Sequence, residues 1–219
     1  MTDKFYKELY EVLYKDHGYH SSEDHWNGTH YPTLFSACLD PSGIEYNTVL
    51  DVGCSTGLGI KHFFEPRGKT CWGIDVSETA INKAIARGCN AKQASITNIP
   101  FKDHSFDLVC STDVIEHLKP EDQEVAWREC FRVSKSYVAH KIANTPEGKK
   151  FGGHTLHLTC PTTTEYWYDF FDSLSLPNWK LIFKMTPEVW KEHEDKIHTE
   201  NSYEKWVYNG TVVVFEKQD

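Results

Sequence analysis

The stretch from Val49 to Gly59 constrains the fold of this chain more than any other part of the sequence. Its apolar start predicts a buried strand, and the glycines that follow predict a tight turn into a helix. Gly53, Gly57 and Gly59 leave room for a ligand to approach the backbone amides of the turn. Their spacing, Gly-x-x-x-Gly-x-Gly, fits neither the dinucleotide fingerprint nor the phosphate-binding loop. The stretch therefore predicts the first strand–turn–helix unit of an α/β fold.

Two acidic residues beside this turn indicate what it binds. Asp51 precedes the glycines, and its carboxylate would repel a pyrophosphate but attract a cationic amino-acid group. Asp75 ends a second apolar stretch, 18 positions after Gly57, where a carboxylate can accept hydrogen bonds from both hydroxyls of a ribose. Ser77 then has the position of a helix N-cap. The pattern favours a nucleoside with a cationic tail, although the glycines alone also suit an ordinary tight turn.

The order of these motifs resembles that of the class I S-adenosylmethionine-dependent methyltransferases. The resemblance covers residues 45–140, including the approach to the fourth strand at 98–109, and it implies S-adenosylmethionine as the cofactor. Many relatives have an acidic residue at the adenine contact where this chain has Ser95, so we expect the Ile96 backbone to make that contact. The cofactor-binding residues that the resemblance implies are Asp51, Gly53, Ser55, Gly57, Asp75, Val76, Ser95, Ile96 and Thr112.

Apolar stretches and helical patterns alternate along the chain, as a parallel sheet with helices on both faces requires. We expect strands at 47–52, 70–75, 90–94, 106–111, 136–142, 180–185 and 207–216, and helices at 4–15, 58–65, 78–87, 121–132 and 162–172. The resemblance implies an α/β, Rossmann-like fold. Its seven-stranded, mostly parallel sheet would have the order 3-2-1-4-5-7-6, with the last strand antiparallel.

The resemblance also implies one methyltransferase domain over residues 1–219. Within it we expect an N-terminal helix and a lid in 1–40, a cofactor-binding half in 45–142 and an acceptor-binding half in 143–219. The histidine-rich segment 16–32 either folds over the cofactor as this lid or forms a polar surface loop.

The fourth strand is followed by residues that can bind a metal or move a proton. If Asp113 opens a short helix, Glu116 and His117 lie on the same side of it. Carboxylates and imidazoles in that arrangement bind divalent cations such as Mg²⁺ or Mn²⁺. His154 and His157 follow the fifth strand and would lie at the same edge of the sheet. The predicted metal ligands are therefore Asp113, Glu116, His117, His154 and His157.

This constellation resembles the Glu-x-x-Glu-His motif of the magnesium-dependent small-RNA 3′-terminal 2′-O-methyltransferases, with Asp113 in place of the first glutamate. A similar motif occurs in the O-methyltransferases of ubiquinone biosynthesis. Other members of the wider family carry a Glu-His pair here without a metal, and their histidine shapes the substrate site or acts as a base. The candidate catalytic residues are Asp113, His117 and His154.

The acceptor is predicted from the chemistry of methyl transfer and from residues 156–171. An alcohol has a pKa of about 15.7, near that of water, and a metal that binds the hydroxyl lowers it. Residues 156–171 resemble a segment of sugar and glycan methyltransferases, in which Trp167, Phe170 and Phe171 either stack on a sugar or belong to the core. We expect an O-methyltransferase that acts on a hydroxyl of a sugar or glycan, with a divalent metal as an optional aid.

Three alternatives stay open at this point. The acceptor is a 3′-terminal ribose of RNA, or it is a catechol-like small molecule, since both offer vicinal hydroxyls. A third alternative, from a different class of function, is a catalytically inactive scaffold subunit that binds the cofactor.

Composition limits partners and compartment. The net charge of −9 argues against a long nucleic acid as partner. No apolar stretch reaches membrane-spanning length, and the first residues do not resemble a signal peptide. The seven cysteines form no Cys-x-x-Cys pair, so we expect free thiols in a reducing compartment and a cytoplasmic protein.

Overall fold

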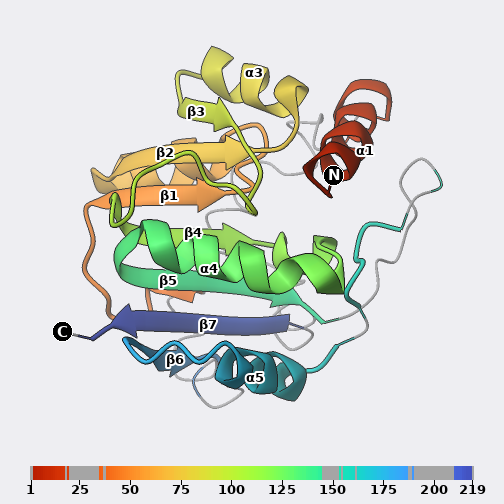
Figure 1. Ribbon diagram of the computed structural model, residues 1–219. Coiled ribbons are helices and arrows are strands. Elements are labelled where there is room, and N and C mark those ends of the chain that lie inside the picture. Colours follow the sequence, from red (N-terminus) through yellow and green to blue (C-terminus); the bar gives the residue numbers. More distant parts are fainter. Residues whose placement is uncertain are drawn as a thin grey trace.

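The computed structural model describes residues 2–17, 19, 35–36, 38–144, 153, 155–160, 162–186, 189 and 210–218. Seven strands within them form one sheet (Figure 1). They are β1 Thr48–Val52, β2 Thr70–Asp75, β3 Asn90–Gln93, β4 Phe106–Thr112, β5 Ser134–Ala143, β6 Trp179–Lys184 and β7 Gly210–Lys217. The α-helices are α1 Thr2–Asp16, α3 Glu78–Ala86, α4 Gln123–Val133 and α5 Thr164–Ser173. Short helical turns occupy Ile60–Phe64, Glu65–Arg67, Ile115–His117 and Pro120–Asp122.

The strand order is β3-β2-β1-β4-β5-β7-β6. The pairs from β3 to β5 are parallel, and β7 is antiparallel to both β5 and β6. This confirms the predicted fold class, a Rossmann-like sheet with one antiparallel strand. The order reverses between β1 and β4, and ligands of such sheets bind at the carboxyl ends of the strands beside that reversal.

Each face of the sheet has its own hydrophobic core. Leu50 on β1 packs on the side that holds Trp127 of α4 and Phe171 of α5. Its neighbour Val49 points the other way, to the side that holds Ile81 of α3. Successive residues of a strand face opposite sides, so both faces must be covered. Figure 1 shows α4 and α5 in front of the sheet.

The helix expected at 58–65 is present in an altered form. Residues Ile60–Phe64 form a π-helical turn, and a 3-10 turn follows at Glu65–Arg67. Phe63 and Phe64 are both fully buried, with their ring centroids 5.5 and 4.7 Å from that of Phe35. Pro66 lacks a backbone N–H and cannot continue the wider turn, so the element ends there.

Two local predictions can be compared with the structure at residue level. Ser77 caps α3, where its Oγ accepts a hydrogen bond from the Ala80 amide at 3.2 Å. The cap of α5 is Thr163, whose Oγ1 accepts a hydrogen bond from the Tyr166 amide at 3.1 Å. Trp167 and Phe171 are 0% and 7% exposed, so these two rings belong to the core and not to a sugar-stacking surface.

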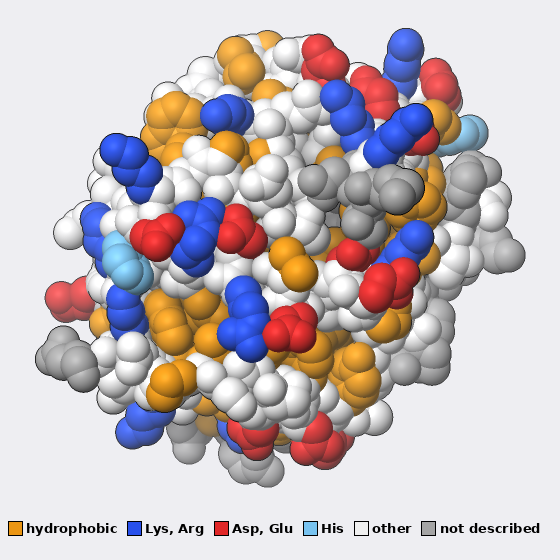
Figure 2. Space-filling view, viewed as in Figure 1, with side chains coloured by type: hydrophobic (Ala, Val, Ile, Leu, Met, Phe, Trp, Pro, Cys, Tyr) orange, Lys and Arg blue, Asp and Glu red, His pale blue; other side chains and the backbone are white. Residues whose placement is uncertain are grey.

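Several expectations fall outside the described residues. They include almost all of the lid segment 16–32, His154, and residues 207–209 at the start of the last expected strand. The single-domain expectation for 1–219 stays a prediction. Among the described residues, no helix combines the length and the apolar character needed to cross a membrane. On the face drawn in Figure 2, basic side chains of the described residues alternate with acidic ones.

Candidate cofactor and acceptor site

The glycine turn after β1 is held in a conformation that favours glycine. Gly53 has a φ of 74°, and its amide donates a 2.8 Å hydrogen bond to the Ile74 carbonyl oxygen. Gly57 has a φ of 82°, and a Cβ added there would lie 2.7 Å from the sulfur of Cys89. Both features exclude larger residues from the turn. The turn therefore has the tight geometry that the sequence predicted.

Asp75 lies at the carboxyl end of β2, at the position predicted for ribose recognition. Its Oδ2 accepts a hydrogen bond from the Ser55 amide at 3.0 Å, and its Oδ1 accepts one from the Ser77 amide at 2.9 Å. Each carboxylate oxygen keeps capacity for a second donor, so two ribose hydroxyls can be accommodated. Burial raises the pKa of Asp75 to about 6 in spite of these hydrogen bonds.

Asp51 lies at the same edge, with 3% of its surface exposed. Burial, together with the charge of Asp75, raises its pKa well above the usual range. A cationic group placed nearby would favour the ionised form of Asp51. Two buried acidic groups at one site suit a ligand that brings its own positive charge.

The remaining predicted cofactor residues end the neighbouring strands. Val76 follows β2, Ser95 and Ile96 follow β3, and Thr112 is the last residue of β4. The Ser95 hydroxyl accepts a hydrogen bond from the Thr97 amide at 3.2 Å and lies 2.8 Å from the Thr97 hydroxyl oxygen. All nine predicted residues thus lie at the carboxyl ends of β1 to β4, and their individual roles stay predictions.

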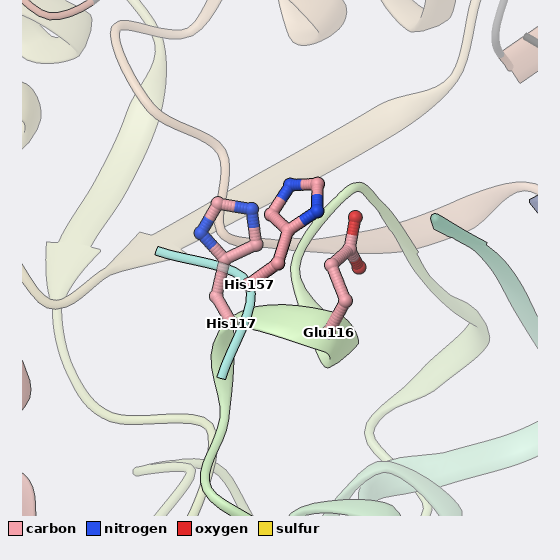
Figure 3. Close-up of side chains that lie close together, drawn as sticks. All are labelled: Glu116, His117 and His157. Atoms are coloured by element: carbon pink, nitrogen blue, oxygen red, sulfur yellow. The ribbon is translucent and has the colours of Figure 1, made fainter. Parts of the chain in front are cut away.

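Three potential metal ligands gather beyond β4. Glu116 and His117 lie on the helical turn Ile115–His117, and His157 comes from the segment after β5. One ligand atom of each lies within 4.8 Å of the others, and the two imidazole centroids are 4.8 Å apart. Figure 3 shows both imidazole rings and the carboxylate together beside this turn. The structure therefore brings together three of the five predicted metal ligands.

Glu116 is completely buried. Its Oε1 accepts a 3.1 Å hydrogen bond from the Ala143 amide, while its Oε2 has no partner among the described residues. Burial, aided by the charge of Asp113, raises the pKa of Glu116 well above its usual range. A cation beside Oε2 would compensate this cost, so the donor set fits a divalent metal.

Asp113 does not join this cluster, which corrects the geometric basis of its prediction. The helical turn begins at Ile115, and Asp113 precedes it with a φ of 54°, so it does not open a helix shared with Glu116 and His117. Its carboxylate instead forms an ion pair with the buried Lys141 of β5. Burial by itself would lower the pKa of Lys141, but the charges of Asp113 and Glu116 outweigh it and raise that pKa.

Two residues of the site were not predicted. The hydroxyl of Tyr10, on α1, is hydrogen-bonded to Nδ1 of His117, and Lys141 is the partner of Asp113. A lysine inside the apolar run of β5 was a visible signal, because buried lysines are rare unless they are paired. Tyr10 gave no comparable signal, because its role depends on where α1 packs.

Known proteins resemble the chain most clearly over the cofactor-binding half. Residues 50–137 match a family described as a methyltransferase domain. Norajmaline N-methyltransferase of Rauvolfia serpentina is 36% identical over 103 residues, 43% of this chain and 34% of the relative. Phosphoethanolamine N-methyltransferase of Plasmodium falciparum is 31% identical over 134 residues, 58% of this chain and 44% of the relative. The chain therefore spans less than half the length of these curated relatives.

A solved structure has the same fold. The plantazolicin methyltransferase in complex with S-adenosylhomocysteine superimposes with a TM-score of 0.67, at 13% identity, over 99% of this chain and 96% of that one. The fold is that of the class I S-adenosylmethionine-dependent methyltransferases. Residues 50–137 match the model of a methyltransferase-domain family, and the predicted cofactor, S-adenosylmethionine, is confirmed.

Proposed function

We propose that this protein transfers the methyl group of S-adenosylmethionine to a hydroxyl of a sugar or glycan, assisted by a divalent cation such as Mg²⁺ or Mn²⁺. The observation that carries the proposal is the cluster of Glu116, His117 and His157 at the cofactor edge of the sheet. A cation held there would lower the pKa of a bound hydroxyl. Vicinal hydroxyls can chelate such a cation, which favours a polyol acceptor.

The chain's own residues supply binding and orientation. Asp75 would accept hydrogen bonds from the ribose, and Asp51 would face the cationic tail. S-adenosylmethionine, when bound, provides an electrophilic methyl group with a sulfide as leaving group. The Tyr10 hydroxyl is hydrogen-bonded to Nδ1 of His117 and so restrains the orientation of that ring. His154, predicted as a further ligand and base, lies outside the described residues.

N-methylation of an amine is the second candidate, favoured by the names of the two curated relatives above. This reaction needs no metal, because a neutral amine is already nucleophilic. When Nδ1 of His117 donates its hydrogen to the Tyr10 hydroxyl oxygen, the lone pair of Nε2 can take the ammonium proton. In this candidate His117 is the base and not a metal ligand.

Methyl transfer from labelled S-adenosylmethionine to a panel of acceptors tests these candidates. The panel contains oligosaccharides, RNA 3′ ends, catechols and primary amines, each with EDTA or with added Mn²⁺. We expect labelled oligosaccharide, loss of turnover in EDTA and recovery with Mn²⁺. Labelled amine that persists in EDTA would replace the proposal with the second candidate. Labelled RNA or catechol alone would change the acceptor, and cofactor binding without any turnover would indicate a scaffold subunit.

Variants of the proposed metal ligands can be compared with a variant of a nearby residue that is not a ligand. Glu116→Gln removes the negative charge of one ligand and His157→Gln removes an imidazole nitrogen, so we expect Mn²⁺-dependent turnover to fall by about 100-fold or more. Glu121→Gln, on the exposed side of the next helical turn, is the control and should retain activity. Wild-type turnover in Glu116→Gln would remove the metal from the proposal.

The compartment is a separate proposal. All seven cysteines are free, and six of them are buried. Free thiols are typical of reducing compartments, so we propose that the protein works in the cytoplasm.

A further inference from the structure

One side of helix α1 contacts both the cofactor site and the acceptor site. Tyr6, Tyr10 and Tyr14 are spaced by four residues, so they lie on one side of the helix. Tyr14 donates a 2.7 Å hydrogen bond to the Ser55 hydroxyl in the glycine turn. Tyr10 lies one helical turn closer to the N-terminus than Tyr14, and it contacts His117. Figure 1 shows α1 beside the carboxyl ends of the strands that carry these residues.

Glu11 is the charged residue of α1 that reaches the loop after β2. Its Oε2 accepts hydrogen bonds from the Ser77 hydroxyl at 2.9 Å and from the Thr79 amide at 3.1 Å. Its Oε1 accepts one from the Thr79 hydroxyl at 2.5 Å. Burial by itself would raise the pKa of Glu11, but the hydrogen bonds from Thr79 and Ser77 outweigh it and lower that pKa. Glu11 is therefore an ionised acceptor at the start of α3.

Ser77 connects Glu11 to the ribose carboxylate. Its hydroxyl donates to Glu11, while its backbone amide donates to Oδ1 of Asp75. The hydroxyl of Ser77 is thus bound to Glu11, and its backbone amide is bound to Asp75. Because the residue is completely buried, a change in the hydroxyl contact is transmitted to the amide that orients Asp75.

We propose that Glu11 is a positioning residue for the cofactor, acting through Ser77 on the orientation of Asp75. This inference rests on S-adenosylmethionine as the ligand of the site, and so deepens the proposed function. Glu11 does not touch the ribose itself. Its contribution is to hold the loop from Asp75 to Thr79 in the geometry that two ribose hydroxyls require.

The test compares Glu11→Gln with Glu8→Gln. Glu8 lies on the same helix and forms an exposed 3.6 Å ion pair with Lys4, so it is a matched control. We expect Glu11→Gln to weaken S-adenosylhomocysteine binding by about tenfold by isothermal titration, and Glu8→Gln to bind as the wild type. At saturating cofactor, kcat should stay within about twofold of wild type, because the effect lies on cofactor affinity.

A second ligand pair distinguishes positioning from general destabilisation. Adenosine carries both the 2′- and the 3′-hydroxyl, whereas 2′-deoxyadenosine keeps only the 3′-hydroxyl of this pair, so the wild type should prefer adenosine. In Glu11→Gln that preference should shrink, because Asp75 is no longer held for the second hydroxyl. The titrations are made at a temperature where circular dichroism shows every variant folded.

Each outcome has one meaning. An unchanged adenosine preference in Glu11→Gln, or equal affinities in the Glu11 and Glu8 variants, overturns the positioning role. Wild-type protein that binds neither S-adenosylhomocysteine nor adenosine contradicts the cofactor itself, which is a failure of the proposed function and not of the Glu11 relay alone.

Discussion

Asp75 couples cofactor recognition to pH. Burial raises its pKa to about 6, so in the free protein its carboxylate becomes protonated below that pH and loses acceptor capacity. A ligand that requires the ionised form binds more weakly as the pH falls through 6. We expect adenosine to bind about tenfold more weakly at pH 5 than at pH 7, by isothermal titration.

Adenosine is the probe because it lacks the cationic tail that would face Asp51. The raised pKa of Asp51 therefore contributes little to this comparison. Asp75→Asn is the control, and its weaker affinity should be independent of pH over the same range. Equal affinity of the wild type at pH 5 and pH 7 would show that the ionised carboxylate is not what the ribose contacts.

Gly57 is subject to two constraints, a positive φ and close packing, and a comparison with Gly68 separates them. Its φ of 82° disfavours a side chain, and an added Cβ would also lie 3.1 Å from that of Ala84. Gly68 has a similar φ of 69° with no atom within 4 Å of an added Cβ. We expect Gly68→Ala to cost about 1 kcal/mol in urea unfolding, from backbone strain alone. Gly57→Ala should cost about 1–3 kcal/mol more, from overpacking.

The same two substitutions also test whether the glycine turn contributes to ligand binding. Gly57→Ala should also weaken S-adenosylhomocysteine binding, whereas Gly68→Ala should leave it unchanged. Equal unfolding free energies for the two variants would mean that the turn relaxes around the added methyl group.

At the residue scale, the sequence predicted positions that depend on the local chain and missed those that depend on packing. Gly53, Gly57 and Asp75 are recognisable because a tight turn and a strand end restrict which residues can stand there. Tyr10 and Glu11 have ordinary positions in an amphipathic helix. Their partners become visible only when α1 is placed against the sheet.

At the element scale, the ends of β4 and β5 are joined by the pair of Asp113 and Lys141. The Asp113 amide also donates a 2.9 Å hydrogen bond to the Lys141 carbonyl oxygen. Asp113→Asn keeps a residue that tolerates the φ of 54° but removes the negative charge that forms the ion pair with the buried ammonium of Lys141. We expect a loss of about 3 kcal/mol in urea unfolding.

The double variant gives the decisive comparison for this pair. In Asp113→Asn/Lys141→Met neither charge remains, so stability should recover most of the loss seen in Asp113→Asn. Lys141→Met is the second single variant. If the stability loss of the double variant equals the sum of the losses in Asp113→Asn and Lys141→Met, the ion pair does not couple the two strands.

The elements themselves were predictable to different degrees. All seven strands were expected, because alternating apolar runs and turn residues define them locally. The turn after Asp113 was predicted as a helix whose side chains share one face, but it is a 3-10 turn of three residues, Ile115–His117. Helical spacing over so few residues cannot distinguish these geometries, since tertiary contacts such as the Asp113–Lys141 pair decide between them.

At the scale of the whole molecule, the strand order followed from the resemblance, whereas the placement of α1 did not. The contacts that join α1 to distant parts of the chain include Tyr6 to Asp122, Tyr10 to His117, Glu11 to Ser77 and Tyr14 to Ser55. No local pattern encodes such partners, because each depends on the packed arrangement of the sheet. These contacts make the helix part of the site rather than a separate extension.

Hydrogen exchange with and without S-adenosylhomocysteine tests this arrangement in one experiment. Bound ligand stabilises the native site over its locally opened forms, so amides whose opening disrupts the site should exchange more slowly. We expect protection in the loops after β1, β2 and β4, and also in α1, because Tyr14 and Glu11 connect that helix to the first two loops. Helix α5 and strand β6 lie at the far edge of the sheet and are the internal control. Protection of the loops with no change in α1 would mean that the helix packs beside the site without contributing to it, whereas slowing in α5 and β6 as well would indicate global stabilisation.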